Sequence, residues 1–147
     1  MGEVKQVTPA EASRILTASG DALYLDVRTE EEFAAGHPEG ALNIPILFRG
    51  PGGPSPNPDF LAVAESVLPK DRAILCGCQS GGRSQMAAGA LTGAGYANVS
   101  NVDGGFGGKR DATGRTVVPG WQESGLPVSQ SPAAGASYVE LKKKAGF

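Results

Sequence analysis

A cysteine, a short glycine-containing loop and an arginine form the part of the sequence best suited to chemistry. The residues are Cys78-Gln79-Ser80-Gly81-Gly82-Arg83, and they follow the apolar run Ala73-Ile74-Leu75-Cys76. Because glycines tolerate unusual backbone angles, successive N–H groups of such a loop can converge on one centre and bind an anion. A helix beginning near Gly82 or Arg83 adds the positive end of its dipole, and Arg83 adds a fixed charge.

These surroundings favour the thiolate form of Cys78, which is the nucleophilic form of cysteine. A cysteine is more often a small core residue. That description fits Cys76, inside the apolar run, better than Cys78, which follows Gly77 in a polar loop. We therefore interpret Cys78 as a nucleophile and expect Cys76 in the core, with a role in resolving or protecting a modified Cys78 as the alternative.

A metal site is a second interpretation of the two cysteines. With the single histidine, His37, they give at most three soft ligands, whereas structural zinc normally takes four. We therefore expect no metal and no other cofactor. A disulfide between Cys76 and Cys78 would close a strained ring, and a single short segment with two cysteines is not a secreted disulfide framework.

The elements around the loop alternate between short apolar runs and helical patterns. Such alternation predicts an α/β fold with a parallel sheet covered on both faces. Ligands of these sheets bind beyond the carboxyl ends of the strands, where the Cys78 loop falls. The predicted strands are residues 22–27, 41–44, 73–76 and 99–102; predicted helices begin at Pro9 and cover 30–35, 59–68 and 83–94.

The remaining segments are predicted to be caps, loops and a tail. Thr8 with Glu11 and Thr29 with Glu32 have the spacing of capping boxes. Glycine and proline cluster at 50–58 and 104–120, which we interpret as loops. Small residues at 131–137 suggest a linker before a short helix at 138–145. We predict a domain over residues 1–130 and a linker with a helical tail over 131–147.

Composition narrows the class of protein. The chain has 147 residues, 40% of them hydrophobic and 19% charged, and a net charge of -2, which suits a single globular domain. Its one basic run, Lys142 to Lys144, is too small for a nucleic-acid surface. It has no apolar segment of about 18 residues, and Met1 to Val7 lack a secretory signal core. We expect a cytoplasmic protein without nucleic-acid or membrane partners.

Four blocks together make the chain resemble the rhodanese homology domain over roughly residues 4 to 128. Order and spacing both agree with the family. The blocks are 25–33, 36–45, the loop from Cys78 to Arg83, and 101–105, with Trp121 and 125–128 closing the domain.

The resemblance implies a three-layer fold with a central five-stranded parallel sheet flanked by helices. It also implies sulfur transfer: the cysteine attacks the outer sulfur of a donor such as thiosulfate, sulfite leaves, and the persulfide passes its sulfur to cyanide or a thiol. By position, Cys78 would carry the sulfur. The N–H groups of Gln79, Ser80, Gly81, Gly82 and Arg83 would hold the persulfide, and Arg83 would assist with donor charge. A protein sulfur acceptor is a further partner that the resemblance allows.

Two alternatives remain beside the sulfurtransferase. Related phosphatases and arsenate reductases have five residues between the cysteine and the arginine, whereas this loop has four. The shorter loop suits a persulfide better than a tetrahedral oxyanion. A non-catalytic or sulfur-carrier module is the other alternative, although inactive members commonly lack the cysteine.

Two features depart from the family pattern. Pro38 follows His37 where a branched apolar residue is usual, which should stiffen the turn. The stretch 107–119 is long, and we expect a surface loop; its basic residues could instead attract anionic donors.

Other residues of the blocks are expected to be structural. Asp26 and Arg28 should orient the strand end and neighbouring loops. His37 should be a hydrogen-bonded turn residue, Asn43 should fix a turn, and Trp121 should pack in the core or an interface.

Overall fold

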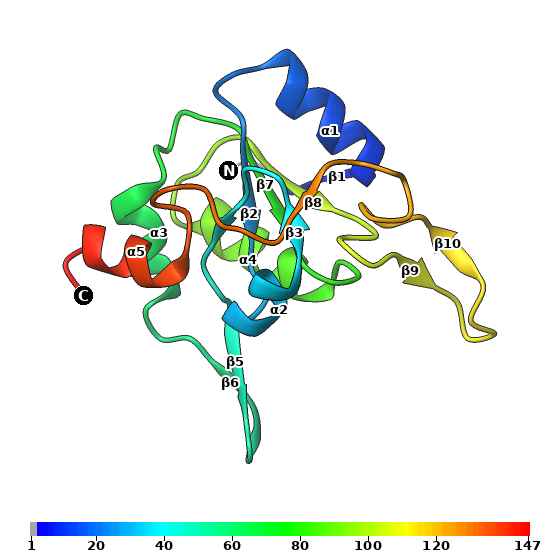
Figure 1. Cartoon of the computed structure of the whole chain (residues 1–147). Helices are drawn as coiled ribbons and strands as arrows, with labels where there is room; N and C mark the ends of the chain where they lie inside the picture. Colours follow the sequence, from blue (N-terminus) through cyan, green and yellow to red (C-terminus); the bar gives the residue numbers. More distant parts are fainter. Residues whose placement is uncertain (1–2) are drawn as a thin grey trace.

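The computed structural model describes residues 3–147, and its centre is a five-stranded parallel sheet (Figure 1). This confirms the predicted sheet. Residues 1–2, which the predicted domain and the Met1 to Val7 segment include, lie outside the described residues. The strand order is β1-β8-β7-β2-β4, with bounds Lys5–Val7 (β1), Leu23–Asp26 (β2), Leu42–Asn43 (β4), Ile74–Gly77 (β7) and Val99–Val102 (β8).

The fifth strand of the sheet, β1, comes from a segment for which the sequence predicts no strand. It pairs in parallel with β8, with Lys5 opposite Ser100 and Val7 opposite Val102. Only Val7 of this strand is partly buried, so an edge strand of three residues leaves no apolar run in the sequence.

Helices cover both faces of the sheet (Figure 1). On one face α1 and α2 pack over Tyr24, Leu75 and Val102. On the other, α3, α4 and α5 pack over Leu25 and Ile74 among others. Neighbouring strand residues therefore serve opposite layers, as the pleat requires. The helices are Pro9–Ala18 (α1), Glu30–Ala35 (α2), Phe60–Val67 (α3), Gly82–Gly93 (α4) and Tyr138–Lys144 (α5).

The starts of the helices follow from local sequence. Thr8 with Glu11 and Thr29 with Glu32 form the two predicted capping boxes at α1 and α2. Helix α4 has Gly81 as its N-cap, at a φ of 127°, which L side chains rarely adopt. The glycine therefore lets the chain turn from the Cys78 loop directly into α4.

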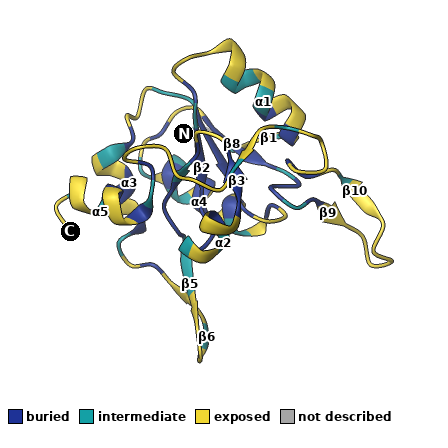
Figure 2. Ribbon diagram, viewed as in Figure 1, coloured by how far each residue is buried: buried dark blue, intermediate teal, exposed yellow. Residues whose placement is uncertain are grey.

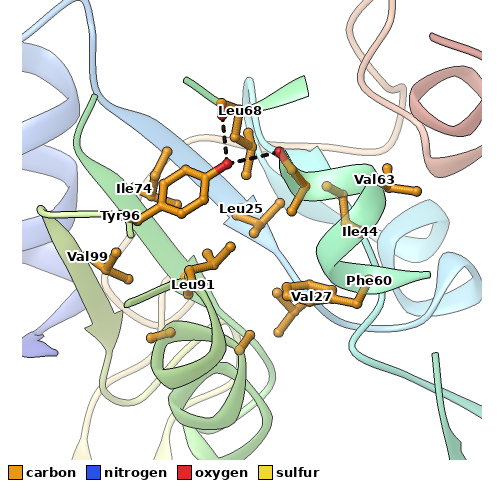
Figure 3. Packing of buried hydrophobic residues seen from close by; sticks show 14 of the residues in the cluster. Leu25, Val27, Ile44, Phe60, Val63, Leu68, Ile74, Leu91, Tyr96 and Val99 are labelled. Atoms are coloured by element: carbon orange, nitrogen blue, oxygen red, sulfur yellow. Dashed lines mark hydrogen bonds between the residues drawn. The ribbon is translucent and has the colours of Figure 1, made fainter. Parts of the chain in front are cut away.

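The larger core cluster lies on the α3/α4 side and surrounds Tyr96 (Figure 3). The Tyr96 hydroxyl lies 3.1 Å from the Ala64 carbonyl oxygen and 2.7 Å from the Leu68 carbonyl oxygen. Burial, assisted by the charge of Glu65, raises the pKa of Tyr96 to about 12. The phenol therefore stays protonated and ties the end of α3 to the turn after α4.

The two segments interpreted as loops contain β-hairpins, so that part of the prediction is wrong. Strands β5 (Leu47–Gly50) and β6 (Gly53–Pro56) pair in one, and β9 (Lys109–Arg110) and β10 (Thr116–Val118) pair in the other. Both project from the body and are largely exposed (Figure 2). Each strand of an isolated hairpin has one edge that pairs with no other strand. A proline whose nitrogen faces that edge removes no hydrogen bond between strands.

The C-terminal segment packs on the domain. Tyr138 and Leu141 of α5 are buried in the larger cluster, and the Asn57 side chain donates to the Tyr138 hydroxyl at 2.9 Å. Strand β11 (Val128–Ser129) pairs antiparallel with β3 (His37–Pro38) before it. The division of the chain at residue 130 stays a prediction. Among the described residues, none of the helices has the length and apolar character needed to span a membrane.

Candidate active site

The Cys78 loop begins at the carboxyl end of β7, the central strand of the sheet. The ends of β2 and β8 lie on either side of it, because these strands are the two neighbours of β7. The order strand, cysteine, glycine loop, arginine and helix is present as the sequence predicts. The carboxyl-end position is where parallel sheets bind ligands.

The Cys78 sulfur is enclosed and accepts hydrogen bonds. Only 2% of the residue is exposed. The Gly81 N–H donates to Sγ at 3.1 Å, and the Ser84 hydroxyl lies 3.3 Å from Sγ. The same hydroxyl lies 2.5 Å from Asn101 Oδ1 on β8. The Gly81 carbonyl oxygen is a third acceptor, at 3.2 Å. Since a hydroxyl has one proton, Ser84 donates to only one of these three acceptors at a time.

Residues 104–107 hydrogen-bond to the backbone carbonyls of the Cys78 loop. The N–H groups of Gly104, Phe106 and Gly107 donate to the carbonyls of Ser80, Cys78 and Gln79 at 3.0, 2.8 and 2.9 Å. In a trans peptide unit the C=O and N–H point in opposite directions. The N–H groups of the next three residues, 79 to 81, are therefore directed away from this segment, and that of Gly81 reaches Sγ.

The close approach of this segment requires a glycine. Gly105 has a φ of 53°, and a Cβ there would lie 2.9 Å from the carbonyl carbons of both Cys78 and Gln79. Real Cβ atoms essentially never come within 3.0 Å of such atoms. Any larger residue would therefore displace the loop or the segment behind it.

Arg28 ties the β2 end to the loop, as expected for a positioning residue. It makes an ion pair with Asp26 at 2.8 Å, and both side chains are almost fully buried. It also donates to the Gly36 carbonyl at 2.7 Å and reaches the Gln79 side-chain oxygen at 3.4 Å. Its guanidinium stacks over Phe106, 4.4 Å from the ring centroid. The buried charge is thus fully partnered.

Arg83, expected to assist with donor charge, forms a two-point ion pair with Glu32 of α2, at 2.7 and 3.0 Å. Burial alone would raise the pKa of Glu32, but hydrogen bonds from Arg83 and Thr29 outweigh it and lower the pKa to about 2. The hydrogen bond with Glu32 raises the pKa of Arg83 in turn. Both groups are therefore charged, and the pair borders the loop.

Two hollows flank the loop. One, of about 340 Å³, includes Ser80, Gly81, Gly82 and Lys109. The other, of about 390 Å³, includes Arg28, Glu32, Gln79 and Phe106. Lys109 belongs to the long 107–119 stretch, so one of its basic residues does reach the site, where it pairs with Asp103 at 3.4 Å.

Cys76 belongs to the core, as predicted. It is fully buried in β7, and burial, together with the nearby Cys78, raises the pKa of its thiol well above the usual value. In residues 3–147, no three or more His, Cys, Asp or Glu side chains gather as a metal site would need.

Three further residues have structural roles. His37 is hydrogen-bonded as expected, with Nδ1 2.7 Å from the Phe33 carbonyl oxygen and its ring stacked on Phe33, but it lies in strand β3 and not in a turn. Asn43 donates to the backbone carbonyls of Asp26 and Arg28 at 3.0 Å each. Trp121 is buried and packs edge-on against a neighbouring tyrosine.

Sequence reasoning did not find Ser84, Asn101, Glu32 or Gly105 as site residues. Ser84 could have been found, because it follows Arg83 in the first turn of a helix that starts at the loop. The local sequence indicates only a capping role for Glu32, because its contact with Arg83 spans 51 residues of chain.

A comparison with known families identifies the class of protein. The family described as "Rhodanese-like domain" matches residues 8–110, well over half of the chain. The chain therefore belongs to the rhodanese-like family.

Individual relatives agree with this class. Thiosulfate sulfurtransferase 16, chloroplastic, from Arabidopsis thaliana is 41% identical over 80% of this chain and 97% of its own length. Protein HIGH ARSENIC CONTENT 1, mitochondrial, from the same organism is 43% identical over 69% of this chain, but the match spans only 63% of that protein. The crystal structure of Rv0390 from M. tuberculosis is 31% identical, covers 88% of this chain and all of its own, and has a TM-score of 0.74.

Proposed function

We propose that the protein is a sulfurtransferase that moves a sulfane sulfur from thiosulfate or a related donor to cyanide or a thiol, through a persulfide on Cys78. The observation that carries the proposal is the position of Sγ, enclosed at the N-terminus of α4 and hydrogen-bonded by the Gly81 N–H. Relatives named thiosulfate sulfurtransferase support it.

The reaction has two balanced halves. The Cys78 thiolate attacks the outer sulfur of thiosulfate, an S–S bond forms, and the S–S bond of the donor breaks with its electron pair on sulfite. Cyanide then attacks the outer sulfur of the persulfide, which forms thiocyanate and returns the thiolate. No redox partner is consumed, because sulfur moves without net electron transfer.

The loop contributes by stabilising charge on sulfur. The N–H groups of residues 79 to 81 face away from the 104–107 segment, and the first turn of α4 adds its dipole. Such preorganised donors stabilise an anion without reorganisation during the reaction. The Ser84 hydroxyl adds a further hydrogen bond when its proton is directed to Sγ rather than to the Asn101 or Gly81 oxygen.

The test is formation of thiocyanate from thiosulfate and cyanide by wild type and Cys78→Ser. We expect the variant to lose all detectable turnover and to keep its thermal unfolding midpoint, because serine replaces the thiol at nearly the same size. Cys76→Ala is the matched control, two residues away in the core, and should retain turnover. Full turnover by Cys78→Ser would overturn the proposal.

A second candidate is chemistry on a tetrahedral oxyanion such as arsenate. The observation in its favour is the 43% identity to a relative named for high arsenic content. The four-residue loop argues against it. Cys78-dependent release of phosphate from an aryl phosphate, or Cys78-dependent loss of arsenate, without sulfur uptake from thiosulfate would favour this candidate.

We also propose a cytoplasmic location and a thiol-bearing small molecule or protein as the acceptor in the cell. A persulfide that forms on Cys78 but turns over only with a protein thiol would identify the chain as a sulfur carrier.

A further inference from the structure

Every basic side chain described at the border of the Cys78 loop is paired with a carboxylate. The ion-pair distances run from 2.7 to 3.4 Å. The pairs are Arg28 with Asp26, Arg83 with Glu32, and Lys109 with Asp103. The side chains around the loop therefore add no net charge, and the attraction for an anion comes from backbone N–H groups and the α4 dipole.

The Glu32–Arg83 pair differs from the other two. Arg28 is buried and fixed by several partners, so its charge serves the fold. Lys109 is half exposed, and solvent screens its pair. Arg83 instead lies at the end of the Cys78 loop with 13% of its side chain exposed, and Glu32 opposes it with 24% exposed.

Glu32 is held in place without help from Arg83. Its Oε1 accepts from the Thr29 N–H at 3.2 Å and from the Thr29 hydroxyl at 3.1 Å, as part of the α2 capping box. It also lines the hollow beside Gln79. Arg28 lines the same hollow, and its charge is paired with Asp26. A substrate that enters the hollow therefore meets the fixed negative charge of Glu32, which is paired with Arg83.

We infer that Glu32 determines donor specificity by cancelling the Arg83 charge at the loop. This inference rests on the proposed sulfur transfer. Thiosulfate carries two negative charges. The inference predicts that Glu32 slows sulfur uptake by Cys78 from thiosulfate more than uptake from a singly charged donor with the same sulfane sulfur. Methanethiosulfonate, CH₃SO₂S⁻, is such a donor: the Cys78 thiolate takes its outer sulfur, and methanesulfinate leaves with the electron pair.

The experiment compares sulfur uptake by Cys78 from the two donors, measured by quenched-flow mass spectrometry of the intact chain. The readout is the ratio of the second-order rate constant for thiosulfate to that for methanethiosulfonate. Glu32→Gln preserves the capping box of α2, since glutamine as well as glutamate occupies the third helical position of this motif. Because one opposing charge near the donor is removed, we expect this ratio to rise about fivefold to tenfold at low salt.

Glu31→Gln is the matched control. It removes the same charge from the same helical turn, but Glu31 is exposed, so the ratio should stay within about twofold of wild type. The rise in Glu32→Gln should shrink in about 0.5 M salt, as expected for an electrostatic effect.

A second pair of variants tests the charge balance itself. Arg83→Gln leaves Glu32 unopposed and should lower the ratio by a factor similar to the rise in Glu32→Gln. The double variant restores neutrality and should return the ratio to within about twofold of wild type.

An unchanged ratio in Glu32→Gln, with both donors still loading Cys78, would overturn the inference and leave the sulfur transfer standing. A rise of equal size in Glu31→Gln would also overturn it. If neither donor loaded Cys78 of the wild type, the proposed function would fail, and this inference with it.

Discussion

Replacement of Gly105 by alanine should impair both stability and activity, because this glycine packs against the backbone of the Cys78 loop. Its φ of 53° costs an alanine about 1–2 kcal/mol. The added Cβ would also lie 2.9 Å from the carbonyl carbons of Cys78 and Gln79, and such overpacking costs about 1–3 kcal/mol. The sum is about 3 kcal/mol, which lowers the unfolding midpoint by about 10 °C in a chain of this size.

The effect on activity should be similar in free energy to the effect on stability. Relief of the contact moves the loop carbonyls, and with them the loop N–H groups, including that of Gly81, which donates to Sγ. A misplacement of about 1 Å can cost a factor of about 100 in rate, so kcat/KM for thiosulfate should fall about 100-fold.

Gly114→Ala is the control for Gly105→Ala. Gly114 has a φ of 85°, but a Cβ there meets nothing within 4 Å. It should lose about 1 kcal/mol from backbone strain alone and keep its turnover within about twofold. Thermal unfolding and thiocyanate formation measure both variants. Equal activity of Gly105→Ala and Gly114→Ala would refute the view that the 104–107 segment positions the loop.

Three further predictions concern individual side chains. Ser84→Ala removes a hydroxyl 3.3 Å from Sγ. It should slow sulfur uptake about tenfold, which is the value of one hydrogen bond to a charged group. Unchanged uptake, measured by intact mass, would exclude a hydrogen bond from Ser84 to the reacting sulfur. Tyr96→Phe leaves two backbone carbonyls without their phenol partner. The free energy of unfolding in denaturant titrations should fall by about 1–2 kcal/mol. A smaller loss would show that water replaces the phenol. Because its folded-state pKa is lowered from 4.5 to about 2, Glu32 should stabilise the fold above about pH 4.5 and lose this contribution as pH falls toward 2. The loss should be about 1 kcal/mol after solvent screening, and Glu32→Gln should lack it; identical acid unfolding of the two proteins would contradict this.

The local features of the fold could be predicted from the sequence because their causes are local. The capping boxes at Thr8 and Thr29 depend on residues three positions apart, and both form. The apolar run before Cys78 ends in a glycine loop, and that pattern alone indicates a strand, a turn and a helix start. These signals place Cys78 at the carboxyl end of a central strand.

The hairpins and the edge strand could not be predicted because their strands are only two to four residues long, and those of the hairpins lie in stretches rich in glycine and proline. The first hairpin contains Pro54 and Pro56, which ordinarily argue against a strand. Strand β1 exposes Lys5 and Gln6 and follows the register of β8 rather than a pattern of its own. In each case pairing with a neighbour determines the conformation.

The contacts that refine the site join distant parts of the chain. Arg83 meets Glu32 of α2, and the Cys78 loop rests on residues 104–107. Nothing local to Arg83 indicates that its charge is already paired. The sequence therefore predicts the nucleophile and its loop but not the electrostatic balance around them.

The most direct test of the account is the intact mass of the protein before and after thiosulfate, for wild type and Cys78→Ser. We expect one added sulfur atom on wild type, none on Cys78→Ser, and loss of that sulfur from wild type when cyanide is added. No added sulfur on wild type, or equal addition to both proteins, would contradict the assignment of Cys78 as the sulfur carrier.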